Sequence, residues 1–335
     1  MDNKNMLAGE TILITGGTGS WGYELIEQLL NNTQAKEIRV YSRGEMRQYD
    51  MEKHFNNPRL KFIIGDVRDK DRLLFACQNV DSVIHMAALK HVPVCETNPD
   101  EAIKTNINGT QNLIWAAIEC KVKKVVDIST DKAVDPLNVY GVTKACAEKL
   151  CVSANLHTNH TKFACVRAGN VLGTNGSIIP LFKKQIQEAK DLTITHKDMT
   201  RFSMQVEEAI RLILVALSTM EGGEIFVSKV PSCPVLALAE VMNESLGGGK
   251  SQIKYIGMRP GEKLHETLVS KNEASRTHDF GNYFIVLPYI PMPHLKKAHE
   301  KIQTHPVLKT EYTSENAKIL NHQELSQLLK LGGWI

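Results

Sequence analysis

Short apolar runs rich in β-branched residues alternate with longer helical patterns through the first half of the chain. These runs predict strands over residues 11–15, 37–41, 61–64, 82–85, 124–128 and 162–166. Strands separated by helix-length segments build βαβ units, whose parallel strands form a sheet that helices cover on both faces. The pattern therefore predicts an α/β fold with a Rossmann-type doubly wound parallel sheet.

The regular alternation weakens after about residue 170, where Gly and Pro divide the chain into shorter pieces. The elements expected there are helices near 180–189 and 207–218 and strands near 224–227 and 253–255. We predict a first domain over residues 1–170, to which some later segments return, and a smaller C-terminal substrate-binding region with a tail over 171–335. An amphipathic stretch near 316–329 is one segment that could return to the first domain.

The composition of the chain limits the possible function classes. The 335 residues are 42% hydrophobic and carry a formal net charge of +3, with Lys and Arg dispersed. This does not favour a nucleic-acid or membrane surface, and an anionic small molecule is the better-suited partner. Seven cysteines without a C-x-x-C pair fit a reducing cytoplasm. The longest apolar stretch, near 212–217, is too short to span a bilayer, so we predict a soluble, cytoplasmic protein.

The first predicted strand leads directly into a glycine-rich turn that opens a helical pattern. Glycines let the backbone approach a pyrophosphate, whose charge is met by the free N–H groups and the positive end of the helix. A purely structural turn is the alternative, but the position after the first strand favours a dinucleotide site. The predicted cofactor contacts in the turn are Gly16, Thr18, Gly19, Ser20, Trp21 and Gly22. For Trp21, packing beside the first helix is the favoured role.

The end of the second predicted strand indicates which dinucleotide is bound. An NAD enzyme usually carries Asp or Glu there, beside the adenosine ribose. This chain instead reads Tyr41-Ser42-Arg43, with Arg47 one helical turn further on. A guanidinium suits a 2′-phosphate through paired hydrogen bonds, so NADP is favoured over NAD. Glu45 nearby speaks against NADP, and a solvated surface role for Arg43 is the alternative.

Two further strand ends carry candidate cofactor contacts. Asp66 follows the third strand, where its carboxylate could accept a hydrogen bond from the adenine amino group. Ala87 and Ala88 follow the fourth strand, where small side chains allow a flat cofactor to lie against the backbone. Lys90 can neutralise a phosphate or donate to a ribose. These residues are therefore added to the predicted NADP site.

A cluster of reactive side chains stands between residues 129 and 144. The chain reads Thr130-Asp131-Lys132 and then Tyr140-x-x-x-Lys144. On a helix, Tyr140 and Lys144 lie one turn apart on the same face, so the ammonium favours the ionised phenol. A phenol whose pKa falls in this way from about 10 becomes a usable base near neutral pH. The cluster therefore indicates proton abstraction by Tyr140.

These residues resemble the extended short-chain dehydrogenase/reductase superfamily, and within it the C5-inverting UDP-N-acetylglucosamine 4,6-dehydratases of pseudaminic acid biosynthesis. The resemblance covers nearly the whole chain. Its motifs are the glycine turn, Tyr41-Ser42-Arg43, Gly65-Asp66-Val67-Arg68-Asp69, Ala87-Ala88-Leu89-Lys90-His91, Thr105-Asn106-Ile107, Ser129-Thr130-Asp131-Lys132-Ala133, Gly169-Asn170-Val171, Met199-Thr200-Arg201-Phe202 and Arg259-Pro260-Gly261-Glu262-Lys263-Leu264-His265-Glu266. Flagellin glycosylation and other polysaccharide biosynthesis are the pathways that it leaves open.

The resemblance implies a role for each member of the cluster. Tyr140, assisted by Lys144, removes the C4 hydroxyl proton while hydride passes to NADP, and Thr130 hydrogen-bonds that hydroxyl. A neutral Lys132 takes the C5 proton, and a protonated Asp131 donates to the departing C6 hydroxyl before hydride returns to C6. Reprotonation of C5 from the opposite face gives UDP-2-acetamido-2,6-dideoxy-β-L-arabino-hexos-4-ulose. These roles need the pKa of Lys132 to fall from about 10.4 and that of Asp131 to rise from about 3.9; a simple ion pair is the alternative.

The resemblance also completes the predicted site and suggests an assembly. It adds Val67, Asn106 and Ser129 to the cofactor contacts, beside Tyr140 and Lys144 themselves. The substrate contacts that it implies are Lys90, Asn170, Arg201, Arg259 and Glu262. Ala168 stands where the family pattern usually has tyrosine, which bears on the shape of the substrate pocket. Related enzymes form a dimer contact through the helices that carry Asn106 and Tyr140, so we expect a homo-oligomer, a dimer or higher.

Two other functions stay open. A UDP-sugar 4-epimerase would need Tyr140 and Lys144 but no acid–base pair for C5 and C6, so Asp131 and Lys132 speak against it. A non-catalytic NADP-binding regulator would keep the glycine turn but could lose Tyr140. His157-x-x-His160 lacks further ligands at zinc-site spacing, so no metal is expected. The predicted partner is UDP-N-acetylglucosamine or a close analogue.

Overall fold

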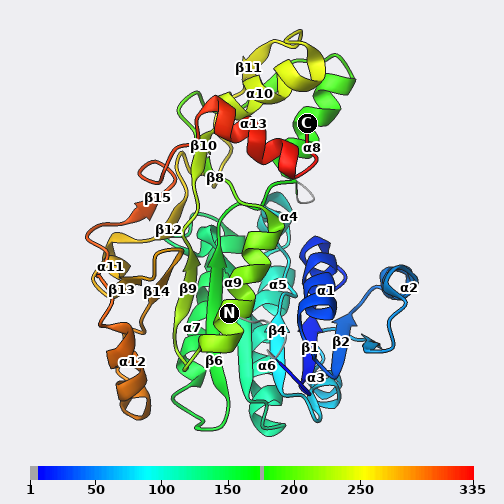
Figure 1. Ribbon diagram of the computed structural model, residues 1–335, viewed down its shortest axis with the longest axis vertical. Helices are drawn as coiled ribbons and strands as arrows, with labels where there is room; N and C mark the ends of the chain where they lie inside the picture. Colours follow the sequence, from blue (N-terminus) through cyan, green and yellow to red (C-terminus); the bar gives the residue numbers. More distant parts are fainter. Residues whose placement is uncertain (1–6, 174–176) are drawn as a thin grey trace.

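A computed structural model of the chain describes residues 7–173 and 177–335 (Figure 1). The strands of its central sheet are β1 (Thr11–Thr15), β2 (Glu37–Ser42), β3 (Leu60–Ile64), β4 (Ser82–His85), β5 (Lys124–Thr130), β6 (Lys162–Ala168), β9 (Ile225–Ser228), β13 (Thr277–Asp279) and β14 (Tyr283–Val286). Three two-stranded pairs lie outside it: β7 (Leu192–Ile194) with β11 (Ile253–Tyr255), β8 (Thr200–Phe202) with β10 (Ser232–Pro234), and β12 (Thr267–Val269) with β15 (Tyr312–Thr313).

The order of the central strands is that of a doubly wound sheet. Within the described residues the order is β13-β14-β9-β6-β5-β4-β1-β2-β3. All pairs from β3 to β9 are parallel, and β14 and β13 complete one edge as antiparallel strands. The predicted Rossmann-type parallel sheet is therefore confirmed. Each strand predicted from a β-branched run agrees with an observed strand to within two residues at either end.

Helices connect these strands and continue into the second half of the chain. The α-helices are α1 (Ser20–Asn32), α2 (Glu45–Phe55), α3 (Lys70–Cys77), α4 (Val92–Thr97), α5 (Pro99–Ala102), α6 (Gly109–Glu119), α7 (Val139–Ala154), α8 (Ile178–Gln187), α9 (Val206–Thr219), α10 (Val235–Gly247), α11 (Lys271–Ala274), α12 (Lys296–Ile302) and α13 (His322–Leu331). A π-helix, η2 (Ile103–Asn108), and the 3₁₀-helices η3 (Asp131–Ala133) and η4 (Pro293–Leu295) complete the set. Over the described ranges, none of them combines the length and apolar character needed to cross a bilayer.

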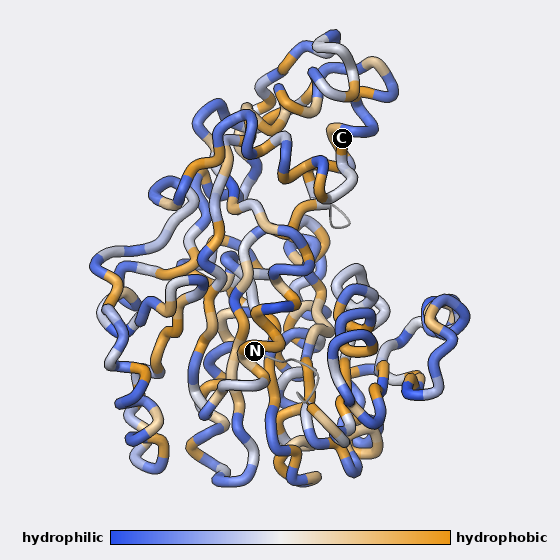
Figure 2. The backbone as a smooth tube through the Cα atoms, viewed as in Figure 1, coloured by the Kyte–Doolittle hydropathy of each residue, from blue (hydrophilic) through white to orange (hydrophobic). Residues whose placement is uncertain are grey.

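Alternate residues of the sheet strands pack into two hydrophobic clusters on opposite faces. Ile12 and Ile14 of β1 join one cluster with residues of α1 and α9. Leu13 between them joins the other cluster with residues of α3, α6 and α7. This alternation follows from the two-residue period of a strand and explains why the strands read as continuous apolar runs. Figure 2 shows these hydrophobic segments gathered along the strands of the body.

Segments from the second half of the chain return to the sheet. Helix α9 packs against α1 and β6, and β9 extends the parallel sheet beside β6. The rest of this half includes an upper lobe in which α8, α10 and α13 lie together (Figure 1). Phe182, Leu238 and Leu325 are in the hydrophobic cluster of that lobe. Residues 171–335 are therefore divided between the body and the lobe.

The helix in the C-terminal amphipathic stretch packs in the upper lobe and not on the first domain. Its helix, α13, begins at His322 after the N-cap Asn321 and packs against α10 in the upper lobe. Leu325 and Leu329 on its apolar side belong to the lobe's cluster. The expectation that residues 316–329 could pack on the first domain is confirmed for Ala317, which belongs to a hydrophobic cluster of the sheet, and is wrong for α13. Amphipathicity shows that one helix face is buried but not against which element.

Candidate active site

The turn between β1 and α1 has a shape that only glycine permits. Gly16 has a φ of +70°, and a Cβ atom placed there would lie 2.7 Å from the backbone nitrogen of Ala87. The loop after β4 therefore lies directly against this turn. At the start of α1 the N-cap is Gly19, which has no side chain to satisfy the first N–H groups, so these can meet an anion. Trp21 packs against both hydrophobic clusters of the sheet, as its favoured role requires.

The basic residues after β2 lie at the surface near Asp66. The side chain of Arg43 is 57% exposed, and its Nη1 lies 3.9 Å from Asp66 Oδ2, so most of its donors face solvent. Arg47, on α2, is also exposed, whereas Ser42 is buried and its hydroxyl accepts a hydrogen bond from the Gln48 side chain. Burial raises the pKa of Asp66, but hydrogen bonds from Arg68 outweigh this and lower it. Asp66 therefore stays ionised and is already engaged by a neighbouring guanidinium.

The loop after β4 is fixed by Asn106 of the π-helix η2. Asn106 Oδ1 accepts from the backbone N–H of Leu89 at 2.8 Å, and its Nδ2 donates to the carbonyl of Leu89 and to Thr143 Oγ1, each at 2.9 Å. Its amide hydrogens are thus used within the protein, so Asn106 shapes the loop that carries Ala87 and Ala88. Lys90, on the same loop, is exposed; desolvation and the Lys132 ammonium lower its pKa. Val67, another predicted contact, is buried.

The end of β5 presents unpartnered polar atoms. Ser129 Oγ is buried and has no hydrogen-bond partner among the described residues. Thr130 Oγ1 donates to Asp131 Oδ1 at 2.8 Å, and Lys132 Nζ lies 3.1 Å from the same oxygen. The other oxygen, Asp131 Oδ2, is buried and likewise has no partner within that part of the chain. Ser129 Oγ and Asp131 Oδ2 are therefore buried polar atoms whose hydrogen-bonding capacity is not used within the described residues.

Lys132 is an ammonium held between two carboxylates. Its Nζ lies 3.1 Å from Asp131 Oδ1 and 3.6 Å from Glu266 Oε1, and Arg201 Nε lies 3.5 Å from the same Glu266 oxygen. Burial alone would lower the pKa of Lys132, but Asp131 and Glu266 outweigh it and raise the pKa above its usual value. The expected fall in the pKa of Lys132 is therefore wrong, and the ion-pair alternative describes the contacts of Lys132.

Tyr140 and Lys144 lie on the first turns of α7 above a buried carboxylate. Lys144 Nζ donates to the two oxygens of Asp127, on β5, at 3.2 and 3.1 Å, and both side chains are buried. Burial raises the pKa of the Tyr140 phenol more than Lys144, Lys132 and a hydrogen bond with Thr130 lower it. The expected lowering of the Tyr140 pKa is therefore wrong, because the burial of the phenol was not visible in the Tyr-x-x-x-Lys spacing.

The predicted substrate residues meet the cluster from the second half of the chain. Arg201, on β8, donates to the carbonyl of Leu264 and lies 3.5 Å from Glu262 Oε1 through its Nη2. Glu262 also accepts from the backbone N–H of Arg259, whose side chain is exposed. Asn170 has a buried Oδ1 with no partner in the described structure. Glu266 thus joins Arg201 to Lys132, and Glu262 is attached through Arg201. The Arg259 side chain stays at the surface.

Residues 12–288 match the model of a family described as polysaccharide biosynthesis protein. The chain belongs to this family. It is 46% identical to an inverting UDP-N-acetylglucosamine 4,6-dehydratase of Campylobacter jejuni over 86% of the chain and 85% of that protein. The resemblance to the inverting dehydratases is confirmed.

Two other relatives widen the comparison. A UDP-glucose 4-epimerase of Rickettsia bellii is 43% identical, over 97% of this chain and 96% of its own length. The solved structure of Pen from Bacillus thuringiensis is 37% identical and superposes with a TM-score of 0.89, over 97% of this chain and 98% of its own. Members of the family with this fold thus include proteins named for two different reactions on UDP-sugars.

Two buried carboxylates in this member of the family were missed from the sequence. Glu266 ends a motif quoted for the resemblance, and its position beside Lys132 depends on a contact between segments more than a hundred residues apart. Asp127 is the one acidic residue in the apolar run of β5, and this was a usable signal. A carboxylate inside a buried strand requires a partner, and Lys144 is that partner.

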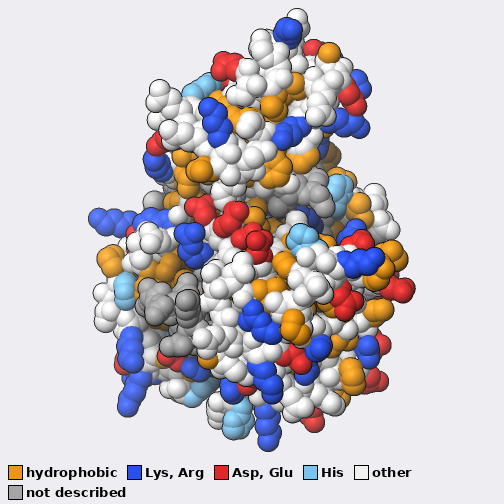
Figure 3. Space-filling model, turned by 45° about the vertical axis from the view of Figure 1, so that its right-hand side comes forward, with side chains coloured by type: hydrophobic (Ala, Val, Ile, Leu, Met, Phe, Trp, Pro, Cys, Tyr) orange, Lys and Arg blue, Asp and Glu red, His pale blue; other side chains and the backbone are white. Residues whose placement is uncertain are grey.

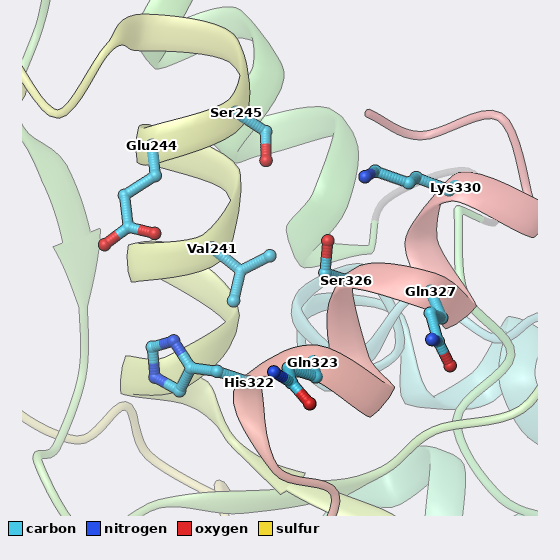
Figure 4. Close-up of a pocket in the computed structure, with 8 residues that line it drawn as sticks. All are labelled: Val241, Glu244, Ser245, His322, Gln323, Ser326, Gln327 and Lys330. Carbon is cyan, nitrogen blue, oxygen red and sulfur yellow. The ribbon is translucent and has the colours of Figure 1, made fainter.

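The residues of the candidate active site gather where the lobe and the body meet. Figure 3 shows charged side chains of both signs along the narrowing between them. A separate cavity of about 490 Å³ lies between α10 and α13, lined mainly by polar side chains such as Glu244, His322 and Lys330 (Figure 4). None of its lining residues belongs to the Tyr140 cluster. In residues 7–173 and 177–335, no group of three His, Cys, Asp or Glu side chains is placed to hold a metal ion.

Proposed function

We propose that this protein is an NADP-dependent hydro-lyase that converts UDP-N-acetylglucosamine into UDP-2-acetamido-2,6-dideoxy-β-L-arabino-hexos-4-ulose. The observation that carries the proposal is the Asp131–Lys132 pair, a carboxylate with a free buried oxygen and an amine beside the phenol of Tyr140. The Campylobacter jejuni relative supports the same reaction. Pseudaminic acid biosynthesis, and through it flagellin glycosylation, is the pathway that the resemblance suggests.

The residues around the glycine turn fit a nicotinamide dinucleotide. The contact of Gly16 with the Ala87 backbone, the uncapped start of α1 and the unpartnered Ser129 Oγ leave groups free to bind it. Arg43 has exposed donors that suit the 2′-phosphate of NADP. When bound, this cofactor accepts a hydride from C4 and later returns it to C6.

Tyr140 acts as the base for the C4 hydroxyl. The charges of Lys144 and Lys132 favour the phenolate, whereas burial opposes it. The phenolate accepts the hydroxyl proton as the C4 carbon loses its hydride, and a 4-keto sugar forms. The ketone then makes the C5 proton acidic enough for an amine to remove.

Asp131 and Lys132 are one proton transfer away from the forms that the next step needs. Lys132 Nζ and Asp131 Oδ1 lie 3.1 Å apart, so moving one proton from the ammonium to the carboxylate gives a neutral amine and a carboxylic acid. A bound sugar that excludes water favours this neutral pair, because charges lose more solvation than neutral groups do. The amine takes the C5 proton, and the acid protonates the C6 hydroxyl, which leaves as water. Reprotonation of C5 from the opposite face inverts that centre.

The nucleotide end of the substrate is assigned to the residues that line the lobe side of the cluster. Arg201, Arg259 and Lys90 supply cations for the diphosphate, Asn170 supplies an unpartnered amide oxygen, and Glu262 orients Arg201. Ala168 lies beside Thr130 in the sheet and is buried, at the position where the family usually has tyrosine.

An epimerase is the second candidate function, because relatives in Rickettsia carry that name. A 4-epimerase needs Tyr140 and Lys144 but has no use for an acid and a base at C5 and C6. The Asp131–Lys132 pair therefore favours dehydration. A non-catalytic NADP-binding regulator would need neither Tyr140 and Lys144 nor the Asp131–Lys132 pair.

One incubation separates these functions. The protein is mixed with NADP and UDP-N-acetylglucosamine in deuterated water, and the products are followed by NMR. We expect a 4-keto-6-deoxy sugar with deuterium at C5. Recovery of UDP-N-acetylgalactosamine would establish the epimerase instead, and unchanged substrate together with NADP binding would favour the regulator. UDP-glucose in a parallel reaction tests the sugar 2-substituent.

We also propose that the protein is a cytoplasmic homo-oligomer. Trp115 of α6 and Val142 of α7 are each about half exposed on the helices that follow Asn106 and carry Tyr140, and apolar residues of this kind support a contact between two copies. Size-exclusion chromatography with light scattering tests it, and a monomer at micromolar concentration would contradict it.

A further inference from the structure

The segment that carries Arg259 runs from the upper lobe to the body. It leaves the lobe at β11, which pairs with β7, and the backbone N–H of Ile256 continues this pairing by donating to the carbonyl of Ile194 at 2.9 Å. Residues 256–260 are exposed, whereas residues 261–266 are half-buried or buried where the chain reaches Lys132. The position of Arg259 therefore depends on the contacts that the segment makes as it enters the body.

A closed turn fixes Arg259 relative to Gly261. The backbone N–H of Glu262 donates to the carbonyl of Arg259 at 3.1 Å, and Glu262 Oε2 accepts from the N–H of Arg259, also at 3.1 Å. Gly261 has a φ of +74°, as the third residue of a type II turn requires, and Pro260 stands at the second position, where proline is common. Arg259 and Gly261 therefore move together.

Asn138 attaches this turn to the helix that carries Tyr140. Its Nδ2 donates to the carbonyl of Gly261 at 3.0 Å, and its Oδ1 accepts from the N–H of Gly141 at 2.8 Å as the N-cap of α7. Asn138 is buried, and a Cβ atom placed on Gly261 would lie 3.2 Å from the Asn138 Cβ, so the turn lies close against this residue. One side chain thus caps α7 and binds the turn.

Further contacts join the same parts of the chain. Lys263 Nζ donates to the carbonyl of Val134, and Glu266 Oε1 lies 3.6 Å from Lys132 Nζ. The loop after Lys132 is itself packed against α7, because a Cβ atom placed on Gly141 would overlap the carbonyl oxygen of Lys132. The turn, this loop and the start of α7 therefore form one connected unit.

We propose that Asn138 is a positioning residue that ties the turn of Arg259 to the start of α7, and thereby fixes the Arg259 guanidinium relative to the phenol of Tyr140. The roles of Arg259 and Tyr140 toward a UDP-sugar rest on the proposed function, whereas the tie itself belongs to the free protein. A diphosphate at Arg259 and a sugar at Tyr140 are parts of one molecule, so the two contacts need a fixed separation. Loss of the tie weakens binding of the whole molecule and displaces its C4 hydroxyl from Tyr140.

The test separates the two hydrogen bonds of Asn138. Asn138→Asp keeps an oxygen for the N–H of Gly141 but has no N–H for the carbonyl of Gly261. Asn138→Ser also caps α7, without an added charge, through a side chain too short to bind the turn. Trypsin is added to the full-length chain without nucleotide, and mass spectrometry follows cleavage after Lys263.

We expect cleavage after Lys263 to become about fivefold faster or more in both variants, because the turn leaves the body more often once this hydrogen bond is lost. An unchanged rate in either variant would overturn the proposal. Cleavage after Lys149, within α7, should keep its wild-type rate, since both variants keep the cap. Equal acceleration there would show general loosening and count against the tie.

Asn321→Asp is the matched control, because Asn321 caps α13 in the lobe through an Oδ1 that accepts from the N–H of Glu324. This variant makes the same change of charge and keeps its own cap, so cleavage after Lys263 should stay at the wild-type rate. Faster cleavage in the control would contradict the proposal, since the effect would not then belong to the bond with Gly261.

The proteolysis and the enzymatic assay fail independently. If the wild type dehydrates UDP-N-acetylglucosamine, both Asn138 variants should lower kcat/KM by about fivefold or more, with a lower kcat as well as a higher KM. The affinity for NADP should not change, because none of these bonds involves the glycine turn. A change in KM alone would refute the positioning of the sugar. If the wild type forms no dehydrated product, the proposed function is lost, while the cleavage rates still decide whether Asn138 holds the turn.

Discussion

The most quantitative prediction concerns Glu273, one of two carboxylates that neutralise the buried Arg167. Arg167, at the end of β6, is 2% exposed; its guanidinium lies 2.7 Å from Glu148 of α7 and 3.0 Å from Glu273 of α11. Burial would raise the pKa of Glu273, but Arg167 and two hydrogen bonds from Ser270 and Arg167 lower it to about 2. The cluster ties α7, which carries Tyr140 and Lys144, to α11.

The lowered pKa of Glu273 makes stability depend on pH in a definite window. The folded value of about 2 lies below the unfolded value of 4.5, so the stabilisation is complete above pH 4.5, is lost as pH falls between these values, and is absent below about 2. The difference of about 2.5 pH units, at about 1.4 kcal/mol for each, corresponds to about 3 kcal/mol. This conversion is appropriate because the Glu273 side chain is only 13% exposed.

We therefore expect Glu273→Gln to lower the free energy of unfolding at pH 7 by about 3 kcal/mol, and the deficit to shrink as the pH falls from 4.5 to 2. Urea unfolding of both proteins across this range measures it. Glu188→Gln is the control, because Glu188 forms an exposed pair with Lys190 and should matter little. A deficit that stays constant between pH 6 and about 2.5 would refute the reasoning.

Three further predictions test the site itself. Lys132→Ala should cut turnover by orders of magnitude yet keep transient NADPH formation. Tyr140→Phe should lose both turnover and NADPH formation while still binding NADP. Unchanged turnover in either variant would exclude the proposed role of that residue. Arg43→Glu should weaken NADP binding by about tenfold or more but leave NAD binding nearly unchanged, as measured by fluorescence titration, and an equal loss for both would argue against a 2′-phosphate contact. Glu266→Gln should move the acid limb of C5 deuterium exchange down by about one pH unit, because Lys132 loses a carboxylate 3.6 Å away; an unmoved limb would exclude that role for Glu266.

The fold could be predicted largely because its signals are local. Each strand of the parallel sheet is buried on both faces, so it appears in the sequence as a short apolar run between helical patterns. The edge strands β13 and β14 were not predicted, since each is only three or four residues long and their pairing with β9 is a long-range contact. The position of α13 was missed for the same reason, because its stripe of apolar residues does not specify a partner.

In the candidate site, too, the features set by local sequence could be predicted and those set by long-range contacts could not. Thr130, Asp131 and Lys132 are consecutive, and Tyr140 and Lys144 share one helix face, so their proximity follows from the chain itself. Their charge states do not, because they depend on Glu266 and Asp127, which other segments bring beside them. Each lysine is paired with a carboxylate of the protein. The sequence therefore predicts which groups lie together, whereas the folded structure determines the ion pairs that they form.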